Sequence, residues 1–72
     1  MNDYIEVDPN IMLGKPVIKG TRIPVYVILN LLAEGYDVPK IIKEYPDLTP
    51  KHILAVFQYA AKMAKFRELA KV

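Results

Sequence analysis

The chain has 72 residues and a mass of 8.2 kDa, is 53% hydrophobic, and carries a formal net charge of +2. A domain of this size buries only about 60% of the surface that its unfolded chain exposes, so small domains often depend on disulfides, metals or oligomers. The sequence has no cysteine and one histidine, His52, which excludes disulfides and disfavours a zinc site built from protein ligands alone. The apolar excess therefore predicts support from a second chain.

The composition also narrows the chemistry and the location. The sequence contains no serine and no cysteine, which excludes catalysis by a serine or cysteine nucleophile. No pair of acids shares a predicted apolar pocket. We expect no catalytic residue, no metal site and no cofactor. The longest apolar stretch, Ile23–Ala33, is too short to span a membrane, and the polar start of the chain does not resemble a signal peptide. A cytoplasmic protein that does not associate with membranes is expected.

Residues 1–23 are predicted to form a ribbon and turns. Tyr4–Val7 alternates between apolar and polar residues, as a short strand does. Asp8-Pro9-Asn10 favours a turn, and Pro16–Ile18 is a second candidate strand. Because the residue before a proline avoids the helical region, Ile23 should end the extended segment before Pro24. These signals predict a small antiparallel ribbon at the start of one domain that covers residues 1–72.

Two short helices are predicted to follow, over residues 24–35 and 37–45. Gly35 supplies the left-handed residue that closes the first helix, and apolar side chains cover about 240° of that helix. Asp37 is the expected N-cap of the second helix. Its apolar residues recur at helical spacing, from Val38 to Tyr45, before Pro46 ends it.

A third helix is predicted over residues 49–70. Thr49 as N-cap followed by Pro50 is a strong helix start. The apolar positions predict a buried stripe, bordered by Leu54, that comprises Ile53, Val56, Phe57, Ala60, Ala61 and Ala64. Beyond Ala64 the stripe fails, so the last turns should project past the domain body. A mostly helical fold is expected: a short N-terminal β-ribbon followed by three helices.

The order of a short helix, a tight break and a long helix with a basic outward side is that of a helix-turn-helix, which lays its second helix in the major groove of DNA. Lysines on this side could release counterions from phosphates. The alternative is an ordinary solvated face, since many three-helix domains never contact DNA. With two residues of the ribbon as clamps on the phosphate backbone, the candidate DNA-binding residues are Lys19, Arg22, Thr49, Lys51, His52, Ala55, Gln58 and Lys62.

A protein interface is the second candidate, because two short helices and a ribbon cannot readily enclose all the apolar residues of the first helix. The candidate interface residues on the first and third helices are Val27, Leu31, Ala33, Phe66 and Leu69. We expect a homodimer formed through the first helix and the ribbon. The alternative is that the ribbon folds over the first helix and covers it, and the pattern leaves open whether the ribbon is exchanged between chains.

One string of residues identifies a relationship. From Asp8 to Val25 the chain contains Gly-Lys-Pro-Val-Ile-Lys-Gly-Thr-Arg-Ile-Pro-Val, and the segment Ile41–Thr49 also agrees. The chain thereby resembles, from about Tyr4 to Ala61, a small prokaryotic family classed as a domain of unknown function and numbered four-three-three. The resemblance implies a homeodomain-like helix-turn-helix and a VapB-type antitoxin that silences a PIN-like nuclease. Unlike many antitoxins, this chain carries little sequence beyond the domain: only residues 62–72, and those look helical.

These observations converge on a hypothesis. We expect a non-catalytic, antitoxin-like DNA-binding protein of a type II toxin–antitoxin system, which binds a PIN-like nuclease toxin and its own operator. Two alternatives remain open. One is a stand-alone transcriptional regulator without a toxin, and the other is a protein-interaction module that never contacts double-stranded DNA. An enzyme is the least favoured class.

Overall fold

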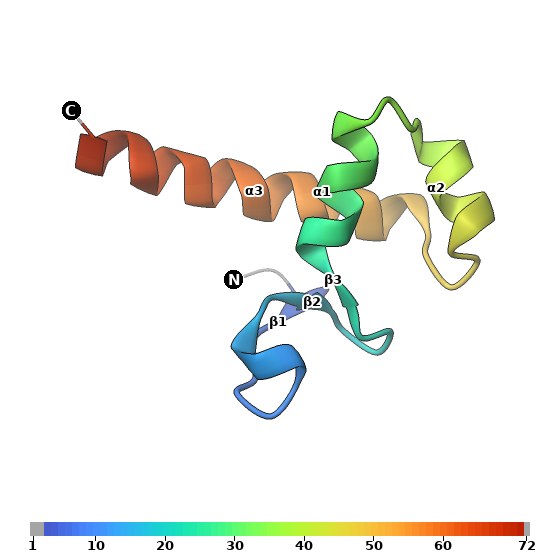
Figure 1. Ribbon diagram of the computed structural model, residues 1–72, viewed down its shortest axis with the longest axis horizontal. Coiled ribbons are helices and arrows are strands. Elements are labelled where there is room, and N and C mark those ends of the chain that lie inside the picture. Colours follow the sequence, from blue (N-terminus) through green and yellow to red (C-terminus); the bar gives the residue numbers. More distant parts are fainter. Residues whose placement is uncertain (1–2, 72) are drawn as a thin grey trace.

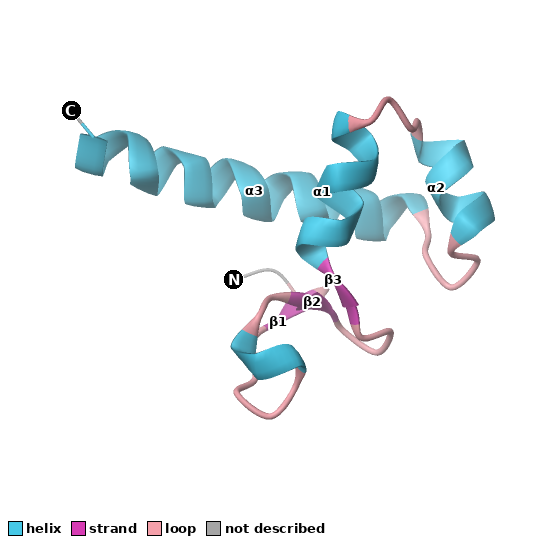
Figure 2. Ribbon diagram, in the orientation of Figure 1, coloured by secondary structure: helices cyan, strands magenta, loops and turns pink. Residues whose placement is uncertain are grey.

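A computed structural model of the chain describes the backbone of residues 3–71 and the side chains of residues 3–65 (Figure 1). A small sheet at the N-terminal end is followed by three helices, and Figure 2 shows how little of the chain is strand. The elements in chain order are β1 (Ile5–Glu6), a 3₁₀ turn (Met12–Gly14), β2 (Val17–Ile18), β3 (Ile23–Pro24), α1 (Val25–Ala33), α2 (Val38–Glu44) and α3 (Pro50–Lys71). The predicted fold class, mostly helical with an N-terminal ribbon, is confirmed.

The ribbon has three antiparallel strands in the order β1-β2-β3. Ile5 pairs with Ile18, and Val17 pairs with Pro24. The third strand was not predicted, because Pro24 lacks the N–H that a strand interior uses. Proline is tolerated here since β3 is an edge strand and Pro24 ends it.

The first helix is fixed at both ends by backbone hydrogen bonds. Its first N–H, from Val25, donates to the carbonyl of Pro16 in the ribbon at 2.9 Å. At its other end Gly35 has φ +97°, and the N–H groups of Gly35 and Tyr36 donate to the carbonyls of Leu32 and Leu31, both at 3.0 Å. This is the glycine-closed helix end that the sequence predicts. It turns the chain sharply toward α2.

The second helix begins after the predicted cap. The Asp37 Oδ1 accepts the backbone N–H of Lys40 at 2.9 Å, which satisfies one of the free donors of the first turn. The break to α3 is closed by the Leu48 N–H, which donates to the Tyr45 carbonyl at 2.9 Å. The Leu48 side chain is 2% exposed, so the break itself contributes to the core.

Every strand and helix except β3 contributes a fully buried residue to the one core cluster, and Ile23 of β3 packs against it. The buried members are Ile5, Ile18, Val25, Ile28, Ile41, Leu48, Ile53 and Val56. Ile5 and Ile18 come from the ribbon, which therefore covers part of α1. Leu31 also packs against this cluster, and Tyr26 is the one large apolar residue of α1 that is exposed. The first helix thus offers less apolar surface than the sequence predicts.

The buried side of α3 differs from the predicted stripe. Ile53, Val56 and also Ala55 are buried, whereas Phe57 is 47% exposed. Tyr59 packs against the core cluster. The predicted stripe was rotated about the helix axis because its alanines fit either side equally well, while the large Tyr59 fills the space beside α1. The prediction for Phe57 is therefore wrong.

The C-terminal half of α3 extends beyond the other elements, as Figure 1 shows. A helix of 22 residues is about 33 Å long, close to the 39 Å longest dimension of the molecule. All side chains from Ala61 to Lys65 are exposed. No helix in the described part of the chain has the length and apolarity needed to cross a membrane.

Replacing Asp37 with alanine tests the cap of α2. We expect Asp37→Ala to lower stability by about 1 kcal/mol, because a backbone donor loses its acceptor. In a domain of this size that corresponds to a fall of roughly 4–8 °C in the thermal midpoint. Asp47→Ala, an exposed aspartate in the next loop, is the matched control and should change the midpoint little. Equal effects of the two substitutions, measured by circular dichroism, would contradict the capping role.

Candidate functional site

The outward face of α3 carries two parallel sets of side chains. The first, the apolar stripe, consists of Leu54, Phe57, Ala61 and Ala64; all are exposed, Leu54 to 57% and Phe57 to 47%. The second, the basic row, consists of Lys51, Gln58, Lys62 and Lys65, all exposed as well. At 100° per residue the stripe covers an arc of about 80° and the row the adjacent arc of about 60°. Both point away from the core side of the helix.

Three of the predicted DNA contacts meet in the basic row, namely Lys51, Gln58 and Lys62. Ala55 does not join them. Its side chain is 2% exposed on the flank of α3 that carries Tyr59, which packs against the core. Ala55 therefore does not belong to the outward face, and the sequence-based placement of that residue was wrong for the same rotation that misplaced Phe57.

His52 and Thr49 form a cap at the start of α3. The Thr49 backbone N–H donates to the His52 Nδ1 at 3.0 Å, and the Thr49 hydroxyl lies 3.0 Å from the same atom. The bond from the Thr49 N–H to the His52 ring is one half of a capping box, with histidine in place of the usual Glu or Gln at the third helical position. The half-buried His52 ring also meets the Tyr4 ring edge-on, with centroids 5.3 Å apart. His52 thus joins the start of α3 to the ribbon.

Lys19 and Arg22 lie in the turn between β2 and β3, on a different element from the basic row. The Thr21 hydroxyl closes this turn by donating to the Ile18 carbonyl at 2.7 Å and accepting the Ile23 N–H at 3.0 Å. Arg22 adopts φ +61° and is exposed with Lys19. The Gly-Thr-Arg string therefore has a structural role in the turn and leaves two cations on its surface.

The loop before β2 exposes apolar residues that the sequence did not single out. Met12 and Leu13 have φ +52° and +57°, the left-handed region that side chains with a Cβ avoid. Leu13 is 94% exposed and Met12 44%. The only sequence signal for this surface was the position of the run Ile11–Leu13 between two turn motifs. Strained and exposed apolar residues of this kind are typical of binding surfaces.

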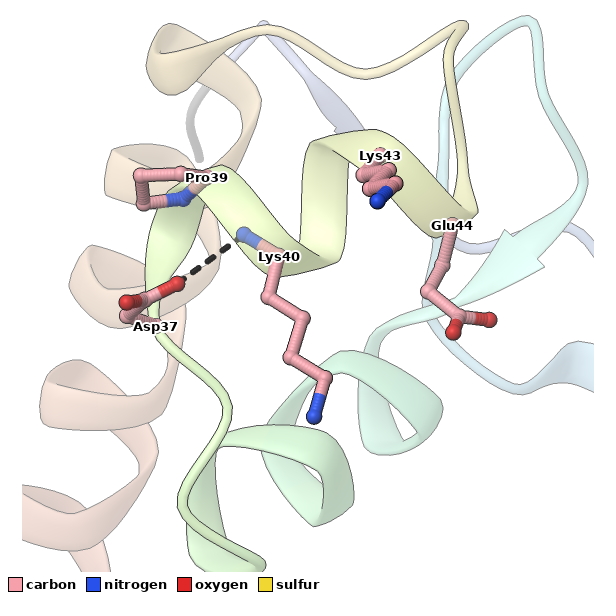
Figure 3. Close-up of a pocket in the computed structure, with 5 residues that line it drawn as sticks. All are labelled: Asp37, Pro39, Lys40, Lys43 and Glu44. Atoms are coloured by element: carbon pink, nitrogen blue, oxygen red, sulfur yellow. Dashed lines mark hydrogen bonds between the residues drawn. The ribbon is translucent and has the colours of Figure 1, made fainter.

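The described surface includes hollows that differ in their lining. A hollow of about 750 Å³ on α2 is lined by Asp37, Pro39, Lys40, Lys43 and Glu44. Figure 3 shows its charged side chains spread along the helix rather than converging, and Asp37 is committed to the cap. These side chains form a solvated helix face.

Another hollow, of about 510 Å³, is lined by Lys15, Pro16, Val25, Tyr26, Leu29 and Tyr59. It lies between the ribbon, α1 and α3, and its walls are largely apolar. The Lys15 ammonium lies 5.2 Å from the centre of the Tyr26 ring, a distance suited to a cation–π contact. Among the described residues, no group of three or more His, Cys, Asp or Glu could hold a metal ion.

The predicted interface residues of α1 are only partly available. Ala33 is exposed, Val27 is half-buried, and Leu31 packs against the core. The side chains of Phe66 and Leu69, predicted on the far end of α3, lie outside the described residues. The large exposed apolar residues of the described surface are thus on the ribbon loop and on α3, more than on α1.

The chain is similar to a described protein family, to a solved structure and to a protein of known sequence. The model of a family described as "Protein of unknown function (DUF433)" matches residues 5–60. A DUF433 member protein from Anabaena variabilis has a similar crystal structure, with a TM-score of 0.82 and 27% identity over 96% of this chain and 70% of the other. "Uncharacterized protein y4eO" of Sinorhizobium fredii is 33% identical over 58 residues, which are 81% of this chain and 26% of that protein.

The fold is therefore that of a small sheet followed by a three-helix unit, and the chain belongs to the DUF433 family. The predicted family is confirmed. The chain spans about a quarter of the length of the relative from Sinorhizobium fredii.

Substitution by glycine should have opposite effects on the free energy of unfolding at Leu13 and at Leu54. We expect Leu13→Gly to raise the free energy of unfolding by about 0.5–1 kcal/mol, because glycine adopts a positive φ without strain. Leu54→Gly, at an exposed position inside α3, should lower it by about 1 kcal/mol. Urea unfolding measures both. A loss of stability in Leu13→Gly would show that the leucine side chain is needed by the loop.

Proposed function

We propose that the chain is a non-catalytic, antitoxin-like DNA-binding protein of a type II toxin–antitoxin system. In this proposal it binds its own operator and a PIN-like nuclease toxin in the cytoplasm. The observation that supports DNA binding best is the basic row on the outward face of α3, the second helix of the α2–α3 pair. Lys51 and Lys62 would contact phosphates, and Gln58 would reach a base edge.

The sequence of α3 strengthens this reading of the row. From Pro50 to Lys65 the helix has three lysines and no Asp or Glu, so no acid on this stretch of the helix neutralises the basic row. The short α2 and the tight break before Pro50 match the order of elements in a helix-turn-helix. Lys19 and Arg22 are exposed and remain candidates for phosphate contacts from the ribbon.

Silencing of a toxin is the part of the proposal that the family resemblance implies. The exposed apolar residues on the ribbon loop and on α3 support it, because a partner chain would cover them.

Binding to a DNA duplex from the region upstream of its own coding sequence tests whether α3 contacts DNA. If the three lysines of the basic row, Lys51, Lys62 and Lys65, each contact a phosphate, the affinity for DNA should fall about 40-fold between 50 and 200 mM salt. Each phosphate contact releases about 0.9 counterion. We expect Lys51→Glu to abolish the gel shift. Lys15→Glu, which changes the net charge equally but lies on the ribbon side, is the control and should retain it. Unchanged binding by Lys51→Glu would remove α3 from this role.

Co-expression with the product of the neighbouring gene tests the toxin. We expect the two chains to co-purify and the nuclease activity of the partner to be suppressed.

Sedimentation of the free chain at micromolar concentration tests the predicted homodimer, which should be the main species. Co-purification without a gel shift would favour the pure interaction module, and a gel shift without any toxin would favour the stand-alone regulator.

A further inference from the structure

The apolar stripe on α3 is not explained by DNA binding. Leu54 and Phe57 are 57% and 47% exposed, and neither side chain can pair with a phosphate. Ala61 and Ala64 continue the same line along the helix. The spacings of three, four and three residues are those of the contact positions in paired helices. A line of this kind on a surface helix is expected to face another helix.

The basic row makes this surface chemically specific. Lys51, Lys62 and Lys65 run along one side of the stripe, and no acid between Pro50 and Lys65 neutralises them. We propose that the outward face of α3 binds one amphipathic helix of a protein partner, whose apolar residues cover the stripe and whose Asp or Glu residues pair with the basic row. This inference deepens the proposed function, and rests on it, since it assigns the surface and the chemistry by which the toxin is held.

The order of side-chain sizes defines the partner helix further. The large residues, Leu54 and Phe57, lie toward the start of α3, and the small residues, Ala61 and Ala64, lie toward its end. Close packing pairs large with small residues, so the partner presents small residues to Leu54 and Phe57 and large ones to the alanines. The stripe spans the eleven residues from Leu54 to Ala64, about 15 Å or three turns, which a partner helix of about 12–16 residues covers.

A second copy of the chain fits this face less well. An antiparallel copy of α3 would match the sizes, with Leu54 against Ala64 and Phe57 against Ala61. The two-fold axis of such a pair would place both basic rows on the same side, where like charges meet. At their exposed fractions, Leu54 and Phe57 offer roughly 100 Å² each, whereas a stable interface buries about 800 Å² per partner. The lysines must therefore contribute, and only an acidic partner allows that.

A synthetic 16-residue helical peptide tests the proposal with the full chain. Its apolar line has small residues at one end and leucines at the other, and glutamates flank that line. We expect the fluorescence anisotropy of the labelled peptide to show saturable binding at low salt. The same peptide with lysines in place of the glutamates should not bind. Absence of binding by the acidic peptide, or equal binding of both peptides, would overturn the proposal.

Substitutions on exposed positions locate the binding. We expect Leu54→Gln and Phe57→Gln each to weaken the acidic peptide at least tenfold, because both remove apolar contact without unfavourable helix propensity. Val7→Gln, at a position after β1 that is 46% exposed, is the matched control and should bind as the unmodified chain does. Lys62→Glu should lose the acidic peptide and gain the lysine peptide. Unchanged peptide affinity in Leu54→Gln and Phe57→Gln would contradict the assignment of this face.

Two further measurements separate this proposal from its alternatives. The variants Leu54→Gln and Phe57→Gln retain all lysines, so they should still shift the DNA duplex. If they lose binding to the duplex but keep binding to the peptide, the stripe contacts DNA and the proposal is overturned. If the chain self-associates and Leu54→Gln abolishes that association, a second copy occupies the face and the proposal fails. Co-purification with the neighbouring gene product that survives both glutamine substitutions would leave the proposed function standing while refuting this surface.

Discussion

The structure depends on the burial of Ile5 and Ile18 against the helices. Strands of two residues cannot stabilise themselves, and α1 and α2, with nine and seven residues, are too short to persist alone in water. The two ribbon isoleucines belong to the same buried cluster as Ile28, Ile41 and Ile53, and this cluster joins the elements into a single core. The placement of α3 follows, because its side with Ile53 and Val56 enters the same core and its opposite side stays in solvent.

The turns make this packing possible within so few residues. Gly35 closes α1 in the left-handed region, the Thr21 hydroxyl closes the β2–β3 turn, and the His52 ring accepts the Thr49 N–H at the start of α3. Each turn uses a side chain or a glycine suited to its backbone conformation. The loop at Leu13 is the exception, since a leucine adopts a positive φ there while almost fully exposed. A backbone conformation that the residue type disfavours, kept at an exposed position, is typical of functional sites.

The division of α3 into a buried and an exposed side joins fold and proposed function. A helix that buries one side in a small core and carries lysines and apolar residues elsewhere presents a basic row beside an apolar stripe. The same surface would serve an operator through the basic row and an acidic helix through the row and the apolar stripe. Because both ligands use Lys51 and Lys62, they would compete. Under the proposed function, such competition would couple toxin capture to operator release through mass action on one helix face.

The local signals in the sequence determined the helices and their ends. Asp37 and Gly35 act through a hydrogen bond and a backbone angle within a few residues, so the sequence alone predicted their capping roles, and Thr49-Pro50 predicted where α3 begins. It also predicted the family and three members of the basic row. It missed β3, because a strand pairing depends on a partner distant in the sequence, and it placed Phe57 inside and Ala55 outside.

Only the tertiary structure decided which side of α3 is buried. The alanines at positions 60, 61 and 64 fit a core or a solvent face at nearly equal free energy, so periodicity left the rotation of the helix undetermined. The shape of the space beside α1 and the ribbon resolved it by accepting Tyr59 and excluding Phe57. The exposed face, and with it the apolar stripe, is therefore a consequence of packing between distant segments.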